Sequence, residues 1–269
     1  MPAETEWTHL YATIKKKIGL DLNLYKQEQL RRRVLGSIES KGFSGIPELA
    51  KAVEADENVC KWLIDRLAIN VSELYRNPEK WVELETKVLP MLLAHTQKLK
   101  IWSAGCSFGA EAHTLSCILE NKFQGSHTIL GTDIDAAALD QAKQGNFCEA
   151  DVRGVPPTIL DRYFTRAGER WQAKDSIRKN LTFRRGDLLS DKFDTGYDLI
   201  LCRNVVIYFT EEAKDVLYRR FFEALKPGGV LFVGGTERIF NSRQVGFEAP
   251  LPFFYQRPLE GDNRWRNAS

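Results

Sequence analysis

The chain has 269 residues, of which 43% are hydrophobic and 28% are charged, and its formal net charge is +2. This composition is typical of a globular protein with one large core, or with a large and a small domain, and it excludes an intrinsically disordered chain. No apolar run approaches the roughly 18 residues of a membrane-spanning helix, and the first residues, MPAETEWTHL, lack the features of a signal peptide. We therefore expect a cytoplasmic protein that does not insert into membranes.

The cysteines and the charge distribution bear on disulfide bonds, metal sites and binding partners. The five cysteines are scattered and never spaced C-x-x-C, so we predict neither a disulfide framework nor a metal site. The small net charge gives no case for nucleic-acid binding. Residues Lys15 to Lys41 nevertheless hold eight basic side chains and three acidic ones. This basic patch suits an acidic partner, although a solvated helix face would give the same pattern.

The first hundred residues have helical periodicity. Apolar residues recur at spacings of three and four from Trp7 to Ile18 and again further along the chain. Asn77-Pro78 is a good helix start, with Asn as the cap and Pro in the first turn, and Pro90 interrupts the apolar stripe that follows. We therefore predict a helical N-terminal domain at residues 1–77 and a linker helix at residues 78–98.

Beyond residue 98 the pattern changes to short apolar runs separated by helical segments. The runs lie at residues 99–104, 128–132, 197–202 and 230–233. Strands that alternate with helices at this spacing predict a mostly parallel sheet covered on both faces. We therefore place a doubly wound α/β domain at residues 99–258.

Two segments do not follow this alternation. Residues 162–185 are polar, with loosely spaced apolar residues and a turn at Gly168, and we interpret them as a small antiparallel β-excursion. Residues 259–269 lack periodicity and are predicted to form a disordered tail.

The segment KIWSAGCSFGAEAHTLSCIL predicts a strand, a glycine turn and an amphipathic helix. Gly105 and Gly109 allow the backbone to turn tightly and to approach a ligand at the carboxyl end of the strand. Free N–H groups at the start of the helix suit a carboxylate. The G-x-x-x-G spacing differs from the G-x-G-x-x-G of dinucleotide sites, which disfavours a nicotinamide dehydrogenase. A tight turn without a ligand is the alternative for this segment alone.

Two later segments carry acidic residues after strands. In GTDID, Asp133 ends a strand 28 residues after Gly105, where a carboxylate can accept hydrogen bonds from both hydroxyls of a ribose. Asp135 is the better helix cap, so we assign the ribose role to Asp133. In RRGDLLSD, Asp187 and Leu188 suit the amino group and the ring face of an adenine, although a solvated turn would give the same pattern.

The segment YDLILCRNVVIYFT predicts a buried strand that ends at Cys202 and delivers Arg203, Asn204 and Tyr208 before the next helix. Polar groups at the carboxyl end of a central strand commonly bind ligands or take part in chemistry. For Arg203 alone, a surface ion pair is the alternative. The later turn KPGG, before an apolar strand, suits methyltransferases better than dehydrogenases.

Together, the segments NVSELYRNPEKW, IWSAGCSFGAEA, GTDID, CRNVVIYFT and KPGGVLFVGGTE resemble the successive motifs of the chemotaxis receptor methyltransferases, the CheR family. The resemblance extends from Trp7 to Arg257. It implies a Rossmann-like class I methyltransferase domain with a small inserted antiparallel β-subdomain, preceded by an all-helical domain. It also implies S-adenosyl-L-methionine as cofactor, S-adenosyl-L-homocysteine as product, and methyl esters on receptor glutamates during sensory adaptation.

The resemblance further implies the site residues. Arg76 takes a catalytic role by orienting the donor or the substrate carboxylate, and Tyr208 takes one by donating a hydrogen bond near the methyl group. Without the resemblance, a surface ion pair and a core tyrosine would explain these two residues equally well. The cofactor contacts, with Gly105 added from the glycine turn, are Asn70, Ser72, Arg76, Gly105, Glu111, Asp133, Asp187, Leu188, Cys202, Arg203 and Asn204.

The chain departs from the family pattern in two places. The family usually has G-E-E-P-Y where this chain has GAEAH, from Gly109 to His113, so one acid is lost and imidazole replaces an aromatic hydroxyl. Glu111 matches the second acid. Ser72 stands where the family usually has Thr and keeps the hydroxyl. The alternative functions are therefore a donor-binding sensor without turnover and a class I methyltransferase with another substrate.

The implied partners are methyl-accepting chemotaxis receptors, whose methylation helices form an acidic coiled coil. The basic patch from Lys15 to Lys41 would steer the enzyme onto this surface. The loop around Gly168 is shorter than in family members that dock on a receptor-tail peptide, which does not favour tail docking. We expect a monomer that binds no nucleic acid.

Overall fold

The structure, a computed structural model, describes residues 2–68 and 70–260, so most of the predicted tail at 259–269 lies outside the described residues. The chain begins with a small helical domain. Apolar side chains from its four helices, such as Trp7, Leu10 and Val34, form one core, which confirms the predicted helical periodicity. The elements are α1 (Glu4–Ile18), η1 (Leu22–Leu24), α2 (Gln27–Lys41), α3 (Ile46–Ala55) and α4 (Glu57–Leu67).

The ends of these helices follow from local sequence. Gly19 and Gly42 adopt left-handed conformations, with φ of 80° and 78°, directly after α1 and α2. Glycine takes this conformation without a Cβ penalty, so the chain can leave the helix there. Asp56 caps α4 by accepting a hydrogen bond from the backbone N–H of Asn58 at 2.8 Å.

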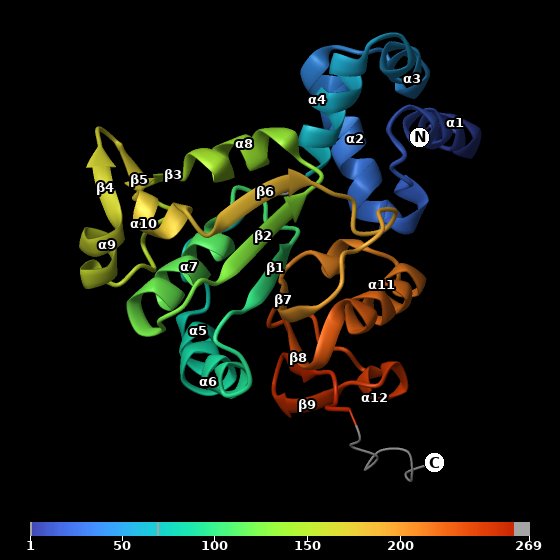
Figure 1. Ribbon diagram of the computed structural model, residues 1–269. Helices are drawn as coiled ribbons and strands as arrows, with labels where there is room; N and C mark the ends of the chain where they lie inside the picture. Colours follow the sequence, from blue (N-terminus) through green and yellow to red (C-terminus); the bar gives the residue numbers. More distant parts are fainter. Residues whose placement is uncertain (1, 69, 261–269) are drawn as a thin grey trace.

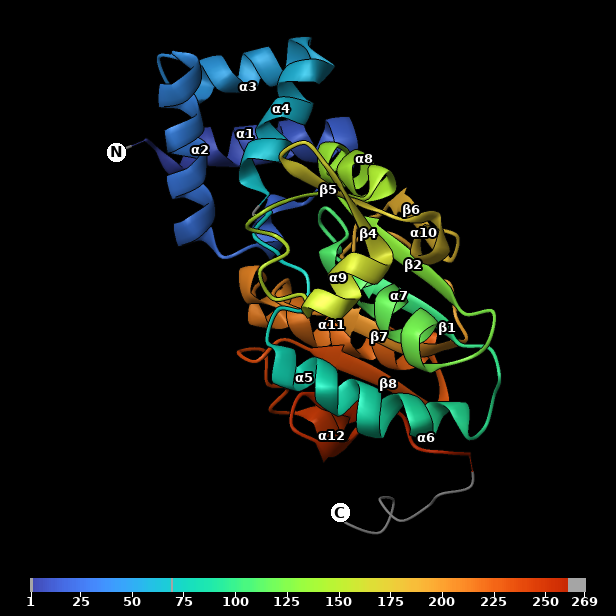
Figure 2. The same ribbon diagram turned by 90° about the vertical axis from the view of Figure 1, so that its left-hand side faces the viewer.

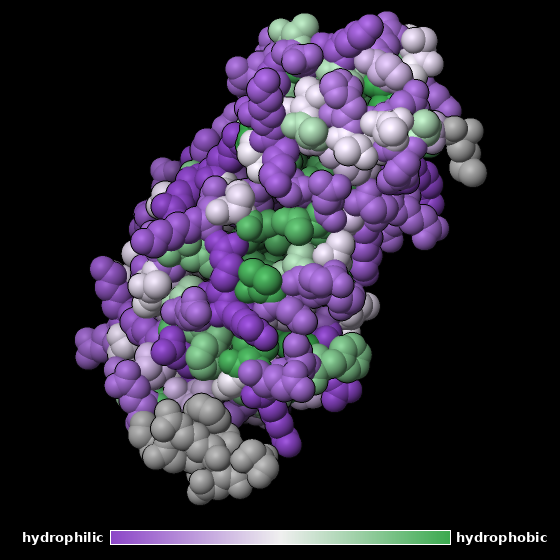
Figure 3. Space-filling model, turned by 90° about the vertical axis from the view of Figure 1, so that its right-hand side faces the viewer, coloured by the Kyte–Doolittle hydropathy of each residue, from purple (hydrophilic) through white to green (hydrophobic). Residues whose placement is uncertain are grey.

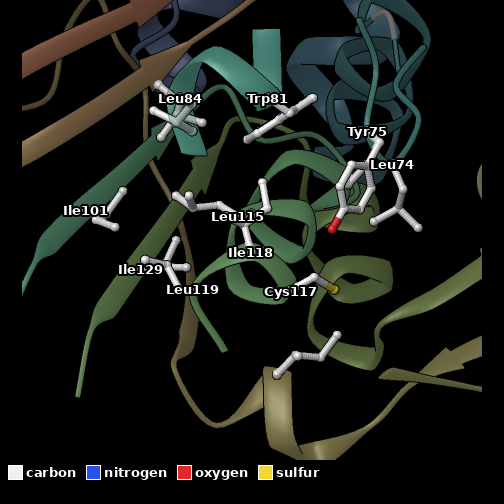
Figure 4. Packing of buried hydrophobic residues seen from close by; sticks show 14 of the residues in the cluster. Leu74, Tyr75, Trp81, Leu84, Ile101, Leu115, Cys117, Ile118, Leu119 and Ile129 are labelled. Carbon is white, nitrogen blue, oxygen red and sulfur yellow. The ribbon is translucent and has the colours of Figure 1, made fainter. Parts of the chain in front are cut away.

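The segment after residue 77 is helical but is not a linker. It comprises α5 (Pro78–Glu83), the π-helical turn η2 (Leu84–Val88) and α6 (Leu89–Leu93). Pro90 does not interrupt it, because Pro90 lies in the first turn of α6, where a missing N–H costs little. Trp81 and Leu84 pack toward β1 and α7, as Figure 4 shows, and Leu74 and Tyr75 join the same core. The core of the large domain therefore includes residues that precede the predicted boundary at residue 77.

The large domain contains a seven-stranded sheet (Figure 1) with the order β6-β2-β1-β7-β8-β10-β9. Its first five strands are parallel, β10 pairs antiparallel with β8, and β9 pairs antiparallel with β10. The order reverses between β1 and β7, which makes their carboxyl ends the expected ligand-binding edge. The strands are β1 (Lys100–Ala104), β2 (Thr128–Asp133), β6 (Leu181–Arg185), β7 (Tyr197–Cys202), β8 (Leu225–Val233), β9 (Glu248–Leu251) and β10 (Phe254–Gln256).

Helices cover both faces of this sheet, as the sequence predicts. Ile101 packs in the core shared with α7 (Ala110–Lys122), whereas the next residue, Trp102, packs in the core shared with α11 (Glu211–Ala224). Neighbouring residues of a strand point to opposite faces, so a strand buried on both sides is apolar throughout. Further helices outside the inserted segment are α8 (Ala136–Gln144), η3 (Val206–Tyr208) and α12 (Ser242–Val245).

The inserted antiparallel sheet differs in extent from the predicted excursion at residues 162–185. It has the order β3-β5-β4, with β3 (Asn146–Cys148), β4 (Phe164–Ala167) and β5 (Arg170–Ala173), and it is flanked by α9 (Pro157–Tyr163) and α10 (Asp175–Arg178). The last predicted segment, β6, instead pairs in parallel with β2 at the edge of the main sheet. β3 escaped prediction because three residues are too short to show a period.

None of the helices within residues 2–68 and 70–260 combines the length and the hydropathy needed to span a membrane. Most of the face in Figure 3 is polar, with hydrophobic surface exposed below the N-terminal helices.

Candidate active site

A cavity lies between the N-terminal helices and the carboxyl ends of the parallel strands. The arrowheads of β2 and β6 point toward the N-terminal helices in Figure 1, and Figure 2 shows these helices beyond the same end of the sheet. Eleven of the twelve predicted site residues line the cavity, namely Asn70, Ser72, Arg76, Gly105, Glu111, Asp133, Asp187, Leu188, Arg203, Asn204 and Tyr208. The fold thus brings residues from distant parts of the sequence to one place.

Cys202 is the predicted site residue whose side chain does not line this cavity. It ends β7, has no exposed surface and packs in the core beneath α11. The last side chain of a strand points into one face of the sheet, while the chain beyond it turns toward the cavity. Burial raises the pKa of the Cys202 thiol well above its usual range, which keeps it an inert packing group.

The glycine turn after β1 brings backbone to the edge of the cavity. Gly105 has φ of 73°, and the N–H groups of Gly105 and Cys106 both donate to the Thr132 carbonyl, at 2.8 and 2.9 Å. A Cβ at Gly105 would lie 2.5 Å from Cγ2 of Val205, so the loop after β7 packs directly on this turn. Only glycine allows this close approach.

Asp133 and Asp135 of the GTDID segment make different contacts, and the predicted helix cap at Asp135 is confirmed. Asp135 caps α8 by accepting from the backbone N–H of Ala138 at 2.9 Å. Asp133 lines the cavity and accepts from the backbone N–H groups of Ser107 and Asp135, at 2.7 and 3.0 Å. Burial raises the pKa of Asp133, while these backbone donors lower it. Each Asp133 oxygen retains a second lone pair for a ribose hydroxyl.

Asn70 ties the segment between the domains to this part of the site. Its Nδ2 donates to Oδ2 of Asp135 at 2.5 Å, and its Oδ1 accepts from the Ser107 hydroxyl at 2.7 Å. Its amide is therefore engaged by protein groups from both the glycine turn and α8. Asn70 fixes the position of the chain that enters the cavity.

Asp187 and Leu188 follow β6, which is an edge strand of the seven-stranded sheet. Both Asp187 oxygens accept hydrogen bonds within the turn, from the Leu189 backbone N–H at 2.8 Å and from the Ser190 hydroxyl at 2.9 Å. Leu188 is 6% exposed and lines the cavity as an apolar wall. Asp187 shapes the turn that presents this wall.

Arg203 and Glu111 form an ion pair in the floor of the cavity, with Nη1 and Oε1 separated by 2.6 Å. The Arg203 side chain has no exposed surface and lies over the rings of Trp81 and Phe232, at 5.3 and 4.7 Å. Burial raises the pKa of Glu111, and Arg203 lowers it. Arg203 is therefore a buried member of the site rather than part of a surface ion pair.

The same arginine holds the chain around Arg76. Its Nη2 donates to the Arg76 carbonyl at 3.3 Å and to Oδ1 of Asn77 at 3.1 Å. Asn77 precedes α5 as predicted, but its side chain makes no cap bond, because Arg203 uses its oxygen. Tyr75 and Asn77 both have positive φ, of 59° and 58°, which is a strained conformation on each side of Arg76.

Tyr208 lies where the N-terminal domain meets the large domain. Its carbonyl accepts from the Lys26 backbone N–H at 2.9 Å, and Tyr25 stacks edge-on against Phe209 at 5.1 Å. Burial raises the pKa of Tyr208, and the charges of Arg33 and Arg76 lower it. Arg33, Arg76 and Tyr208 therefore belong to one cavity lining.

The predicted site residues do not include Tyr25, Arg33 and Glu237. Tyr25 and Arg33 line the cavity from the N-terminal domain, and the pKa of Tyr25 is raised by burial and then by the carboxylates of Asp187 and Asp133. Glu237 accepts four backbone N–H groups beside the cavity. Arg33 lay within the basic patch and Glu237 within the GGTE segment, whereas no local pattern marked Tyr25.

Comparison with known proteins agrees with this geometry. Residues 5–68 match the CheR methyltransferase, all-alpha domain, and residues 70–250 match the CheR methyltransferase, SAM binding domain. A chemotaxis protein methyltransferase of Listeria monocytogenes is 39% identical over 259 residues, covering 95% of this chain and 99% of that protein. Chemotaxis protein methyltransferase 1 of Pseudomonas aeruginosa is 32% identical over 241 residues, covering 85% of this chain and 88% of that protein. The chain belongs to the CheR family of S-adenosylmethionine-dependent chemotaxis methyltransferases.

Proposed function

We propose that this chain transfers the methyl group of S-adenosyl-L-methionine to glutamate side chains of chemotaxis receptors, forming methyl esters and S-adenosyl-L-homocysteine. One observation carries the proposal. A single cavity joins the carboxylates of Glu111 and Asp133 on the catalytic domain to Arg33, on the N-terminal domain, and Arg76. A receptor carboxylate that enters past the arginines would meet the donor within one site.

The residues on the strand side fit the donor. Asp133 has lone pairs for the two ribose hydroxyls, and Leu188 offers an apolar wall to the adenine ring. Arg203 pairs with Oε1 of Glu111, and we assign Oε2 to the ammonium group of the donor. Gly105 keeps the backbone of the turn close to the loop after β7.

Methyl transfer to a carboxylate requires the protein mainly to position the donor and the acceptor. S-adenosyl-L-methionine supplies the methyl group on a sulfonium, which is already an activated electrophile. A glutamate with a pKa near 4.3 is ionised at pH 7, so no general base is needed. Arg76 and Arg33 would hold the carboxylate in line at roughly 3 to 3.5 Å, and Tyr208 would donate a hydrogen bond near the methyl group. The bound donor and the receptor would together displace water from the cavity.

The basic patch contributes fewer free charges than its sequence suggests. Arg31 pairs with Glu4, and Lys15 pairs with Asp21. Arg32 is exposed, whereas Lys26, just before α2, and Arg33, within α2, line the cavity. We propose that these three cations steer the acidic coiled coil of a receptor toward the cavity, with the enzyme acting as a monomer in the cytoplasm.

The GAEAH departure is compatible with turnover. Ala110 and Ala112 have no exposed surface and pack in the core, so the missing acid leaves no gap at the cavity. Glu111 keeps its ion pair with Arg203. His113 takes the place of the aromatic hydroxyl by stacking on Phe183. These contacts favour an enzyme over a donor-binding sensor.

The test is transfer of radiolabelled methyl from S-adenosyl-L-methionine to membranes that carry chemoreceptors. Base-labile label, released as methanol, identifies an ester. We expect Arg76→Ala to abolish transfer and Arg32→Glu to weaken it at low salt, while Arg31→Glu, whose parent side chain is already paired, should change transfer less. Donor binding by calorimetry without transfer would instead establish the sensor, and charge reversal at Arg32 without effect would exclude the steering role.

A further inference from the structure

Glu237 follows β8 and places its carboxylate against the ends of two neighbouring strands. The residue is 3% exposed. Its Oε1 accepts from the backbone N–H groups of Val205 and Val206 at 2.8 and 2.9 Å, and its Oε2 accepts from those of Asn204 and Gly234 at 2.5 and 2.8 Å. Hydrogen bonds to a carboxylate are roughly twice as strong as neutral ones, so this side chain fixes the loop after β7 firmly.

The loop that Glu237 holds forms a wall of the active site. Arg203, Asn204, Val205 and Tyr208 all line the cavity. Asn204 has φ of 60°, a left-handed conformation that residues with a Cβ adopt less readily than glycine. Without the four hydrogen bonds to the Glu237 carboxylate, the loop would relax from this conformation. The side chains before and after Asn204 would then move.

Gly234 is shaped to admit this carboxylate. A Cβ at this position would lie 2.5 Å from Oε2 of Glu237 and 3.0 Å from the backbone nitrogen of Asn204. Both contacts are too short for an ordinary side chain, so a glycine is needed where β8 ends. Two separate features of the chain, the glycine and the glutamate, therefore serve the same contact.

We propose that Glu237 is a positioning residue for methyl transfer, holding residues 204–206 so that Arg203, Asn204 and Tyr208 face the donor and the substrate. Glu237 does not itself line the cavity, and both of its oxygens are occupied by backbone N–H groups. It acts through the loop and not as an acid or a base.

The test is Glu237→Gln in the full chain, since the amide has nearly the same volume but turns an NH₂ group toward two backbone N–H donors. We expect turnover at saturating donor and receptor to fall about 100-fold, as a displacement near 1 Å of reacting groups can produce. Calorimetry should still find full stoichiometry for S-adenosyl-L-homocysteine, and the amides of residues 204–206 should exchange faster with deuterium. The matched control is Glu223→Gln, an exposed glutamate of α11.

The outcomes separate positioning from mere folding. A purely structural role would lower the fraction of chains that bind S-adenosyl-L-homocysteine and leave turnover per binding site unchanged, and that result would overturn the proposal. If E237Q does not fold, Glu237→Asp is the variant to use, because aspartate keeps the charge but reaches fewer of the four N–H groups. Wild-type turnover per binding site in Glu237→Asp would also overturn the proposal. The turnover measurement rests on the proposed function. If the wild type transfers no methyl group, the proposed function is wrong. If the wild type and the Glu237 variant transfer at equal rates, the positioning role of Glu237 is wrong.

Discussion

Protonation of His113 is expected to destabilise the folded protein between pH 6.5 and about 4. His113 has no exposed surface, its Nδ1 lies 2.8 Å from the Gly109 carbonyl oxygen, and its ring stacks on Phe183. Burial lowers the pKa of His113 from 6.5 to about 4; the Gly109 carbonyl opposes this shift, and the charge of Arg178 adds to it. Nε2 has no hydrogen-bond partner among the described residues, so a proton there would be buried without an acceptor.

The direction and size of the effect follow from this pKa. The unfolded chain takes up the proton near pH 6.5 and the folded chain only near pH 4, so the stability associated with neutral His113 is complete above pH 6.5 and is lost as the pH falls toward 4. Each unit of pKa difference corresponds to about 1.4 kcal/mol, which makes the total roughly 3 kcal/mol.

The measurement is urea unfolding at several pH values between about 4 and 8, on the wild type and on His113→Phe. Phenylalanine keeps an aromatic ring against Phe183 and cannot titrate in this range. Burial raises the pKa of Glu111 and Asp133, which gives the opposite slope, so the difference between the two proteins is the quantity to use. His9→Gln, on the exposed face of α1, is the control. Equal pH dependence in wild type and His113→Phe would refute the reasoning.

Three further substitutions test the site. Arg203→Ala leaves Glu111 buried and unpaired, so the free energy of unfolding in urea should fall by about 3–5 kcal/mol, and a fall below about 1 kcal/mol would contradict the buried pair. Asp133→Asn weakens the acceptor for the ribose, and calorimetry should show the Kd for S-adenosyl-L-homocysteine rising about tenfold or more; an unchanged Kd would remove Asp133 from that role. Tyr25→Phe deletes one hydroxyl from the cavity, and the same Kd should rise about three- to tenfold, whereas wild-type affinity would show that Tyr25 does not touch the ligand.

Much of the fold was predictable because buried apolar residues recur at regular spacings along a helix or a strand. Apolar spacing of three and four marked the helices of the N-terminal domain. Apolar runs marked β1, β2 and β7, of which β1 and β7 are buried on both faces. The prediction failed where no period could develop or where context overrode it. β3 has three residues, β6 is a half-exposed edge strand, and Pro90 is accommodated after a π-helical turn.

The sequence by itself identified the family, the donor class and the polar residues that follow β1, β2, β6 and β7, because strand ends, glycine turns and acidic residues lie within a few positions of one another along the chain. The tertiary structure alone decided which of those groups act together. It paired Arg203 with Glu111, 92 positions away, and it brought Tyr25 and Arg33 over the cavity. The physical reason is that local sequence constrains backbone conformation over a few residues, whereas charge pairing and burial depend on distances across the folded chain.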